Sequence, residues 1–279
     1  MKTTVARKVT STATVLATAF GVAGVALAMA PASQAHGTSS GWGETFLLKN
    51  SLQGGGADAT HVFGGTQEVT LLGDWDGDGV ETPGIKNGRE YQLWNNWAGG
   101  APAYAFTFGP ATPGTAVVGD WDGDGDDTIG VRPAGTTTFH LTNDLAAGPA
   151  DVSFTYGPSY VDVLSGDWDG DGDDTIGVRP SGTNTFHLRN SLTAGFADRV
   201  VAFGRATDEA VAGDWNADGT DTIALHRAQY IYVQNTHSGG TDLTLAFGTP
   251  WDALLAGDWD GDGDDTFGVL RVTEGSCGC

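Results

Sequence analysis

Aspartate residues recur along this chain at the spacing of a metal-binding turn. Residues 119–131 read GDWDGDGDDTIGV, and related stretches begin at Gly73, Gly166, Gly213 and Gly257. Counted from the first aspartate, each stretch has oxygen-bearing side chains at positions 1, 3 and 5, and a glycine at position 6 where the backbone can reverse. Together with the carbonyl of position 7, these side chains supply the oxygen ligands that Ca²⁺ prefers.

The sequence therefore predicts up to five bound Ca²⁺ ions, one in each loop. The predicted ligands are Asp74, Asp76, Asp78, Asp120, Asp122, Asp124, Asp167, Asp169, Asp171, Asp214, Asn216, Asp218, Asp258, Asp260 and Asp262. Carboxylates this close repel one another, which favours a bound cation over the alternative of a solvated acidic turn without metal. An EF-hand is excluded, because position 12 is aliphatic rather than glutamate and the flanking segments are rich in the β-branched residues of strands.

The acidic charge of the chain is concentrated in these loops. The sequence has 35 Asp and Glu against 13 Lys and Arg, a formal net charge of −22. The loop acids account for the whole excess, so the other acidic residues balance the basic ones. We expect no nucleic acid partner, since no basic face remains to contact phosphates.

The elements that must position the loops are short strands. Successive loops are 46, 47, 47 and 44 residues apart. In the second copy, apolar or alternating segments lie at 116–120, 128–133, 138–143 and 152–157, and Gly, Pro, Asn and Asp residues separate them. Four antiparallel strands in each period of about 45 residues are typical of a propeller blade. The predicted fold class is all-β, a five-bladed β-propeller of four-stranded antiparallel blades.

The two ends of the repeat region complete each other. The first strands expected, at 45–50 and 61–64, correspond to the third and fourth of a blade, and the last, at 254–258 and 266–271, to the first and second. Strands from both termini would thus close the ring and leave no exposed edge. The expected propeller spans 44–271 and is a monomer. The alternative is an open array, or an oligomer that completes a larger ring.

Residues 1–35 are predicted to be an export signal, which would make the protein secreted and extracellular. A basic start precedes an apolar run over 13–30, and a small-residue cleavage motif ends at Ala35. A transmembrane anchor is the alternative, disfavoured because the run is short and weakly hydrophobic, so we expect no membrane insertion after cleavage. Residues 36–43 form an N-terminal lead and 272–279 a tail. An N-terminal His36 could chelate copper, but no matching second histidine is evident.

The repeat resembles the FG-GAP, or VCBS-type, repeat of integrin α-subunit propellers and of many secreted bacterial proteins. The resemblance is carried by Phe108-Gly109, by the loop 119–125 and by Gly130-Val131-Arg132-Pro133, and it extends over nearly all of 44–271. It implies a calcium loop whose ligands include position 9, usually aspartate. The residues at position 9 here are Thr82, Thr128, Thr175, Thr222 and Thr266.

Because a threonine hydroxyl is a poorer ligand, two outcomes are open. Either the acid at position 8 turns into the loop, or the affinity falls. The acids at position 8 are Glu81, Asp127, Asp174, Asp221 and Asp265. The fourth loop, with Asn216 and Ala217, carries the least charge and should be the weakest site.

Aromatic residues give a weaker indication of a binding surface. The tryptophans at position 2 of each loop could stack on sugars, but their five-fold repetition favours packing between blades. These are Trp75, Trp121, Trp168, Trp215 and Trp259. Trp42, Trp94, Trp97 and Trp251 break the repeat and are better indications of a specific surface.

Other polar residues are less informative. His140 and His187 occupy positions that other copies fill with Leu, Gln or Tyr, which favours a structural role. Arg132 and Arg179 follow the second strand, where they could brace the loop carboxylates. Four acids, Glu68, Asp162, Glu209 and Asp252, begin first strands and could converge as in a glycosidase. Cys277 and Cys279 allow a small disulfide, a link between chains or part of a metal site.

These patterns predict a secreted calcium-binding propeller that binds an extracellular protein or glycan, as in adhesion, and is not an enzyme. Calcium is expected to be mainly structural. The alternatives are a multivalent, lectin-like carbohydrate binder with similar pockets between blades, and a five-bladed glycosidase.

Overall fold

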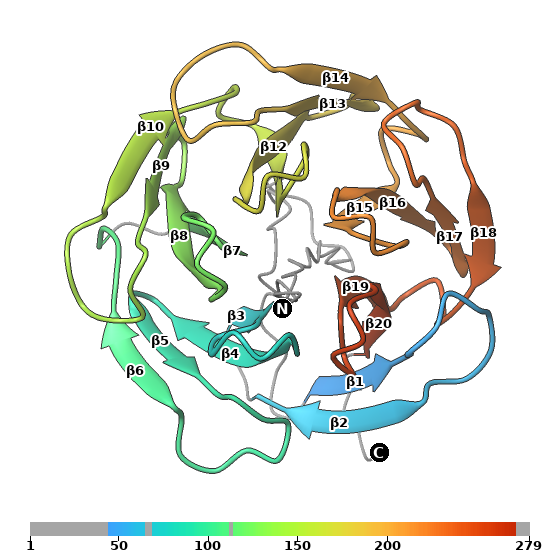
Figure 1. Cartoon of the computed structure of the whole chain (residues 1–279), viewed down its shortest axis with the longest axis horizontal. Coiled ribbons are helices and arrows are strands. Elements are labelled where there is room, and N and C mark those ends of the chain that lie inside the picture. Colours follow the sequence, from blue (N-terminus) through green and yellow to red (C-terminus); the bar gives the residue numbers. More distant parts are fainter. Residues whose placement is uncertain (1–43, 65–68, 112–113, 272–279) are drawn as a thin grey trace, which may run out of the picture.

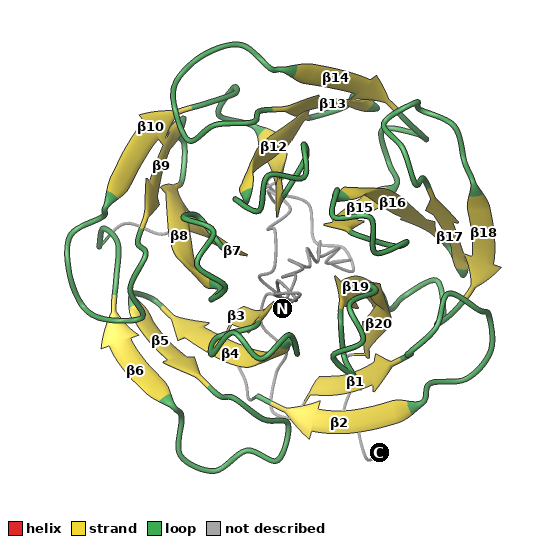
Figure 2. Cartoon of the chain, viewed as in Figure 1, coloured by secondary structure: helices red, strands yellow, loops and turns green. Residues whose placement is uncertain are grey.

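The computed structural model describes residues 44–64, 69–111 and 114–271, and these residues form strands and loops only (Figure 2). Twenty strands make five sheets of four strands each, arranged around one axis (Figure 1). Every pair of neighbouring strands in a sheet is antiparallel. The predicted fold, a five-bladed β-propeller, is confirmed.

Four blades are continuous in sequence. Blade 1 comprises β3 (Val69–Gly73), β4 (Thr82–Asn87), β5 (Glu90–Leu93) and β6 (Tyr104–Thr107). Blade 2 comprises β7 (Gly114–Gly119), β8 (Thr128–Pro133), β9 (Thr138–Leu141) and β10 (Val152–Thr155). Blade 3 comprises β11 (Val161–Gly166), β12 (Thr175–Pro180), β13 (Thr185–Leu188) and β14 (Arg199–Ala202). Blade 4 comprises β15 (Glu209–Gly213), β16 (Thr222–Arg227), β17 (Tyr230–Val233) and β18 (Leu243–Ala246).

The fifth blade is built from both ends of the described chain. Its first two strands are β19 (Ala253–Gly257) and β20 (Thr266–Arg271), and its outer two are β1 (Glu44–Leu48) and β2 (Ala59–Phe63). Strand β1 pairs with β20 from Thr45 opposite Arg271 to Leu48 opposite Gly268. The ring therefore closes within one chain, and the alternative of an open array is wrong.

The apolar core is divided among the blade borders. At the border of blades 2 and 3, Trp121, Phe139 and Leu141 of one blade pack against Val163 and Ile176 of the next, and all five are buried. The other four borders hold equivalent clusters. Alternation along the third strands produces this packing, because every second side chain faces the same neighbouring sheet.

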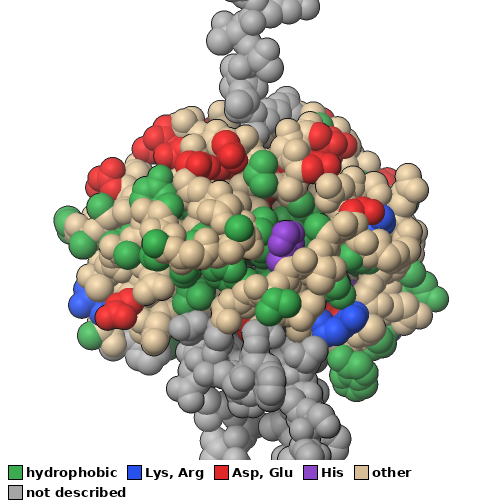
Figure 3. Space-filling view, turned by 90° about the horizontal axis from the view of Figure 1, so that it is seen from below, with side chains coloured by type: hydrophobic (Ala, Val, Ile, Leu, Met, Phe, Trp, Pro, Cys, Tyr) green, Lys and Arg blue, Asp and Glu red, His purple; other side chains and the backbone are tan. Residues whose placement is uncertain are grey.

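The acidic loops lie where this architecture places them. The first strand of each blade is nearest the axis in Figure 1 and the fourth is outermost. The connection between the first and second strands is therefore repeated five times around the axis. In the edge-on view, most of the visible acidic side chains gather at one face of the ring (Figure 3). The loops that hold the predicted ligands belong to this face.

Candidate metal centres

Each acidic loop is a turn folded around its first aspartate. In the second loop, Asp120 Oδ1 accepts the N–H groups of Gly123 and Asp124 at 2.9 and 3.2 Å, and its Oδ2 accepts that of Gly125 at 3.1 Å. Gly123 and Gly125 have φ of 70° and 111°, so the turn needs two residues in left-handed backbone conformations. The position-6 glycine thus has the role that the sequence assigns to it.

The turn brings the predicted ligands together in four loops. One carboxylate oxygen from each of positions 1, 3 and 5 lies within 4.8 Å of the others in these triads. The four triads are Asp74, Asp76 and Asp78; Asp120, Asp122 and Asp124; Asp167, Asp169 and Asp171; and Asp258, Asp260 and Asp262. Position 1 is buried or half-buried and positions 3 and 5 are exposed. Such a cluster of carboxylates, open to solvent on one side, is a donor set suited to a divalent cation.

The fourth loop differs in two ways. Its position 3 is Asn216, whose Nδ2 donates to Asp218 Oδ2 at 3.1 Å, so the loop brings together only the carboxylates of Asp214 and Asp218. Its position 4 is Ala217, which has a φ of 53° where the other loops have glycine. An alanine pays a steric cost in this region. Both features agree with the expectation that this site is the weakest.

A side chain that the sequence reasoning missed holds position 3. Asn143, which follows β9 in the same blade, donates from Nδ2 to Asp122 Oδ2 at 2.8 Å. Three other loops have the same bond, from Asn50 to Asp260, from Asn95 to Asp76 and from Asn190 to Asp169, at 2.6 to 2.8 Å. The signal was present, because an asparagine follows the third strand of every blade.

These asparagines also provide a test of whether a cation fits. The Oδ1 atoms beside the loops are buried and have no hydrogen-bond partner among the described residues. They belong to Asn50, Asn95, Asn143, Asn190 and Asn235. A buried amide oxygen without a partner is costly, and four of these belong to asparagines that donate to a position-3 aspartate, where a cation or a water would satisfy them. The residues present therefore fit an oxygen-ligated cation.

The threonine at position 9 is hydrogen-bonded to a backbone carbonyl in every loop. Thr128 Oγ1 donates to the carbonyl of Gly119 at 3.2 Å, and the threonines of three other loops make the same bond. In the fourth loop Thr222 donates instead to the carbonyl of Gln234. Each threonine hydroxyl thus donates its proton to the backbone rather than pointing freely into the loop.

The acid at position 8 does not turn into its own loop either. Asp174 is buried, and its Oδ2 accepts the N–H of Asp120 in the preceding blade at 3.0 Å. We call the five acids at this position the interface acids: Glu81, Asp127, Asp174, Asp221 and Asp265. The acid at position 8 is therefore held by the neighbouring blade, and positions 1, 3 and 5 remain the candidate side-chain ligands in the four aspartate triads. Fewer ligands favour weaker calcium affinity.

Burial and mutual repulsion raise the pKa of several carboxyl groups in the loops. Burial raises the pKa of Asp167, Asp214 and Asp258, although several backbone N–H groups that donate to these carboxylates oppose the shift. Burial, followed by the charge of Asp171, also raises the pKa of Asp169. A cation would relieve both causes, since it neutralises the carboxylates and replaces their lost hydration.

The position-2 tryptophans are buried between blades, as expected from their repetition. Trp75, Trp121, Trp168, Trp215 and Trp259 are at most 8% exposed. Several of them pack against a residue of the next blade that lies two places after its strand-end asparagine. His237, for example, packs against Trp168. Burial lowers the pKa of His237 to about 4. These tryptophans are not surface platforms.

The non-repeating tryptophans are mostly not surface residues, which corrects the prediction. Trp94 is buried edge-on against Phe63, and half-buried Trp97 stacks on His61 and donates to the carbonyl of Glu81. Trp97 occupies the position that other blades fill with Leu or His. Only Trp251, at 83% exposure, projects from the described surface.

The sequence suggested that the arginines after the second strands brace the loop carboxylates, but the structure gives these arginines other partners. Arg179 donates to Asp162 at 2.6 Å, and Arg271 donates to Asp252 at 2.6 and 2.9 Å. Glu209 lies 2.9 Å from His226 Nδ1. The acids that begin first strands are thus held in structural pairs. Arg132 instead donates to the backbone carbonyls of Thr136 and Pro158.

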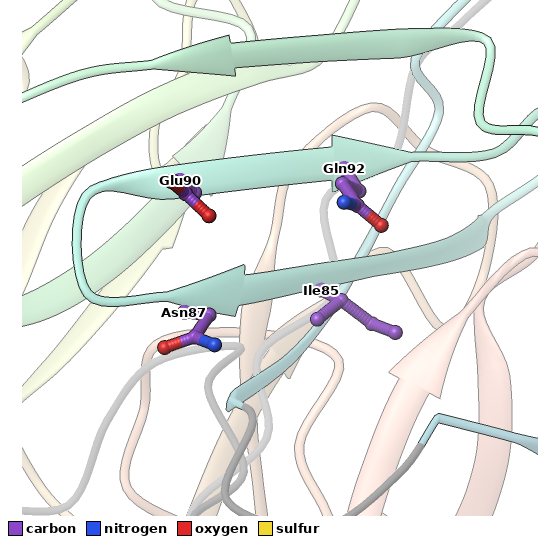
Figure 4. A pocket seen from close by; sticks show the side chains of 4 residues that line it. All are labelled: Ile85, Asn87, Glu90 and Gln92. Carbon is purple, nitrogen blue, oxygen red and sulfur yellow. The ribbon is translucent and has the colours of Figure 1, made fainter.

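Two small recesses lie on the described surface. One, of about 230 Å³, is lined by Phe108, Pro110, His140 and Pro149 with adjoining residues of blades 1 and 2. His140 Nδ1 lies 2.9 Å from Ser153 Oγ there. The other, of about 50 Å³, is bordered by Ile85, Asn87, Glu90 and Gln92 of blade 1 (Figure 4). His187 is half-buried on β13, at the position of His140 on β9.

Several predictions fall on residues outside the described ranges. These are the export signal at 1–35, His36 and Trp42 in the N-terminal lead, Glu68, and the tail with Cys277 and Cys279. Within the described part of the chain, no helix is long and apolar enough to cross a membrane.

Searches against protein families, curated proteins and solved structures found no match. The resemblance to FG-GAP repeats therefore depends on the loop and strand residues quoted above. The five-bladed ring and the four aspartate triads agree with it.

Proposed function

We propose that this chain is a secreted calcium-binding β-propeller in which calcium is structural and the ring serves as a binding module. The observation that carries the proposal is the convergence of three carboxylates in each of four equivalent loops. All ligands are oxygens, the set that selects hard cations such as Ca²⁺ over soft metals. Each ion would cross-link the first and second strands of its blade and neutralise part of the loop charge.

The export signal expected at 1–35 fits this proposal. Extracellular calcium sites commonly have dissociation constants of ~10⁻⁴–10⁻³ M, which suits loops with only three carboxylate ligands. At a calcium concentration 100-fold above the dissociation constant, one site adds about 2.7 kcal/mol to the folded state. Calcium outside the cell would then stabilise the ring, and its removal would loosen it.

Calcium binding by isothermal titration calorimetry tests the proposal. Asp122→Asn should weaken calcium binding at the second site, because it removes one carboxylate from the second triad and leaves the donor set of the fourth loop. Asp144→Asn is the matched control, since Asp144 is an exposed acid of the same blade outside the triad. The proposal is wrong if the wild-type protein binds no calcium at millimolar supply, or if both variants lose binding equally.

Two features outside the calcium loops allow the binding role to be examined. Trp251 is an exposed aromatic residue of the kind that anchors protein ligands, and the recess beside His140 could hold one sugar ring. A glycan array with and without calcium separates the two ligand classes. Sugar-inhibitable binding that His140→Ala removes would support a lectin-like role, and no binding to the array would favour a protein ligand.

A further inference from the structure

The calcium loop of each blade is hydrogen-bonded to the loop of the next blade through its position-1 aspartate. The N–H of Asp120 donates to Asp174 Oδ2 at 3.0 Å, and the carbonyl of Asp120 accepts the N–H of Asp174 at 2.6 Å. Both backbone groups of a predicted calcium ligand are therefore held by one residue of the neighbouring blade. The side chain of Asp120, in turn, organises the second loop by accepting the N–H groups of Gly123, Asp124 and Gly125.

The same pair of bonds occurs at all five borders. The side-chain bonds run from Asp74 to Asp127, from Asp120 to Asp174, from Asp167 to Asp221, from Asp214 to Asp265 and from Asp258 to Glu81, at 2.6 to 3.0 Å. Reciprocal backbone bonds of 2.6 to 3.0 Å accompany each of them. The bonds thus form a closed cycle, in which the last border is completed between Asp258 and Glu81 of blade 1.

Local packing leaves the interface acids little freedom. A Cβ atom placed on Gly119, the residue before Asp120, would lie 2.7 Å from Asp174 Oδ2. Equivalent contacts occur between Gly166 and Asp221 and between Gly213 and Asp265. A glycine before the first aspartate therefore leaves room for the acid of the next blade. A larger residue in place of this glycine would displace the acid and so disturb its bond to the position-1 aspartate.

We infer that each interface acid positions the first calcium ligand of the preceding blade and thereby couples the five calcium sites around the ring. The inference rests on the proposed calcium binding. Asp174 is three residues from Asp171, the position-5 ligand of its own loop. An ion that orders the third loop therefore also fixes Asp174, and through it Asp120 in the second loop.

Coupling of this kind has defined consequences. Energetic coupling between sites is typically 5- to 150-fold in affinity, and it is reciprocal for binding. The wild-type protein should therefore bind calcium with a Hill coefficient above 1. Loss of one interface acid should weaken the site of the preceding blade more than the site of its own blade.

Site-resolved NMR titration of the full chain tests this direction. The amides of Gly125 and Gly172 donate to the position-1 carboxylates of the second and third loops, so each reports calcium at one site. In Asp174→Ala, the calcium midpoint of Gly125 should rise about fivefold or more, while that of Gly172 rises by a smaller factor. Asp174→Asn keeps an oxygen that can accept the Asp120 N–H, so it should restore much of the wild-type midpoint at Gly125.

Asp173→Ala is the matched control, because it removes an adjacent carboxylate whose charge acts on Asp120 and Asp122. An equal rise of the Gly125 midpoint in Asp173→Ala and Asp174→Ala would overturn the inference, since the effect would then come from charge alone. An unchanged calcium midpoint at the Gly125 amide in Asp174→Ala would overturn the inference as well. A wild-type protein in which neither amide responds to calcium would instead refute the proposed function.

Discussion

Calcium should reverse the direction in which the stability of this protein depends on pH. Burial, followed by repulsion from neighbouring carboxylates, raises the pKa of four interface acids well above the ordinary value. These are Glu81, Asp174, Asp221 and Asp265. Because the folded pKa lies above the unfolded one, the folded protein binds more protons between the two values. Without calcium, stability is then greatest below the unfolded pKa of ~4 and falls as the pH rises through the folded pKa.

The size of this effect follows from the number of protons involved. Each proton taken up on folding changes the free energy of unfolding by about 1.4 kcal/mol per pH unit. For a domain of this size, that corresponds to a shift of ~3–6 °C in Tm. With calcium bound the sign is opposite, because only ionised carboxylates bind the ion and protons compete with it. Acidification then removes the ~2.7 kcal/mol that a well-filled site contributes.

Thermal unfolding followed by circular dichroism at pH 7, 6 and 5 measures both slopes. In metal-free buffer the Tm should rise toward pH 5, and in excess calcium it should fall. Asp174→Asn removes one of the raised carboxyl groups, so its metal-free slope should be flatter by up to 1.4 kcal/mol per pH unit. A metal-free Tm that falls steadily from pH 7 to pH 5, with Asp174→Asn indistinguishable from wild type, would refute the reasoning.

Three substitutions test other parts of the structure. Ala217→Gly should raise the free energy of unfolding by about 0.5–1 kcal/mol in chemical denaturation, because Ala217 has a φ of 53°, and a lower value would contradict the assigned strain. Phe46→Ala should cost about 3–5 kcal/mol, since Phe46 is fully buried on the closing strand β1, and a loss below 1 kcal/mol would show that the closure is loose. Arg271→Ala should cost about 2–3 kcal/mol because it leaves the buried Asp252 carboxylate without its cation, and adding Asp252→Asn should recover part of that loss in the same assay.

The fold could be predicted from the sequence because its information is local and repeated. The expected strand at 266–271 matches β20, and the expected strand at 116–120 differs from β7 (Gly114–Gly119) by one or two residues at each end. Loop aspartates and turn glycines bound each strand on both sides. Pairing of half-blades from the two ends followed from counting strands, without any knowledge of packing.

The candidate loop ligands could be predicted equally well from the sequence, because positions 1, 3 and 5 lie within one turn. Roles that depend on another blade could not. In the sequence, Asp174 is one more acidic residue of the third loop. Its hydrogen bond to the N–H of Asp120 depends on how blade 2 packs against blade 3. Within blade 3, the pairing of Arg179 with Asp162 depends on the register of β11 and β12, which places the two residues opposite each other. Trp94 of blade 1 was misjudged because its burial depends on Phe63, which lies on β2 of the adjacent blade 5.

The most direct test of the calcium centres is a crystal structure of the protein grown in calcium, with an anomalous difference map that locates the ions. We expect a peak in each of the four aspartate triads, with carboxylate oxygens at about 2.3–2.6 Å, and a weaker peak in the loop of Asn216. Triads that show ordered carboxylates and no anomalous peak at saturating calcium would contradict the account.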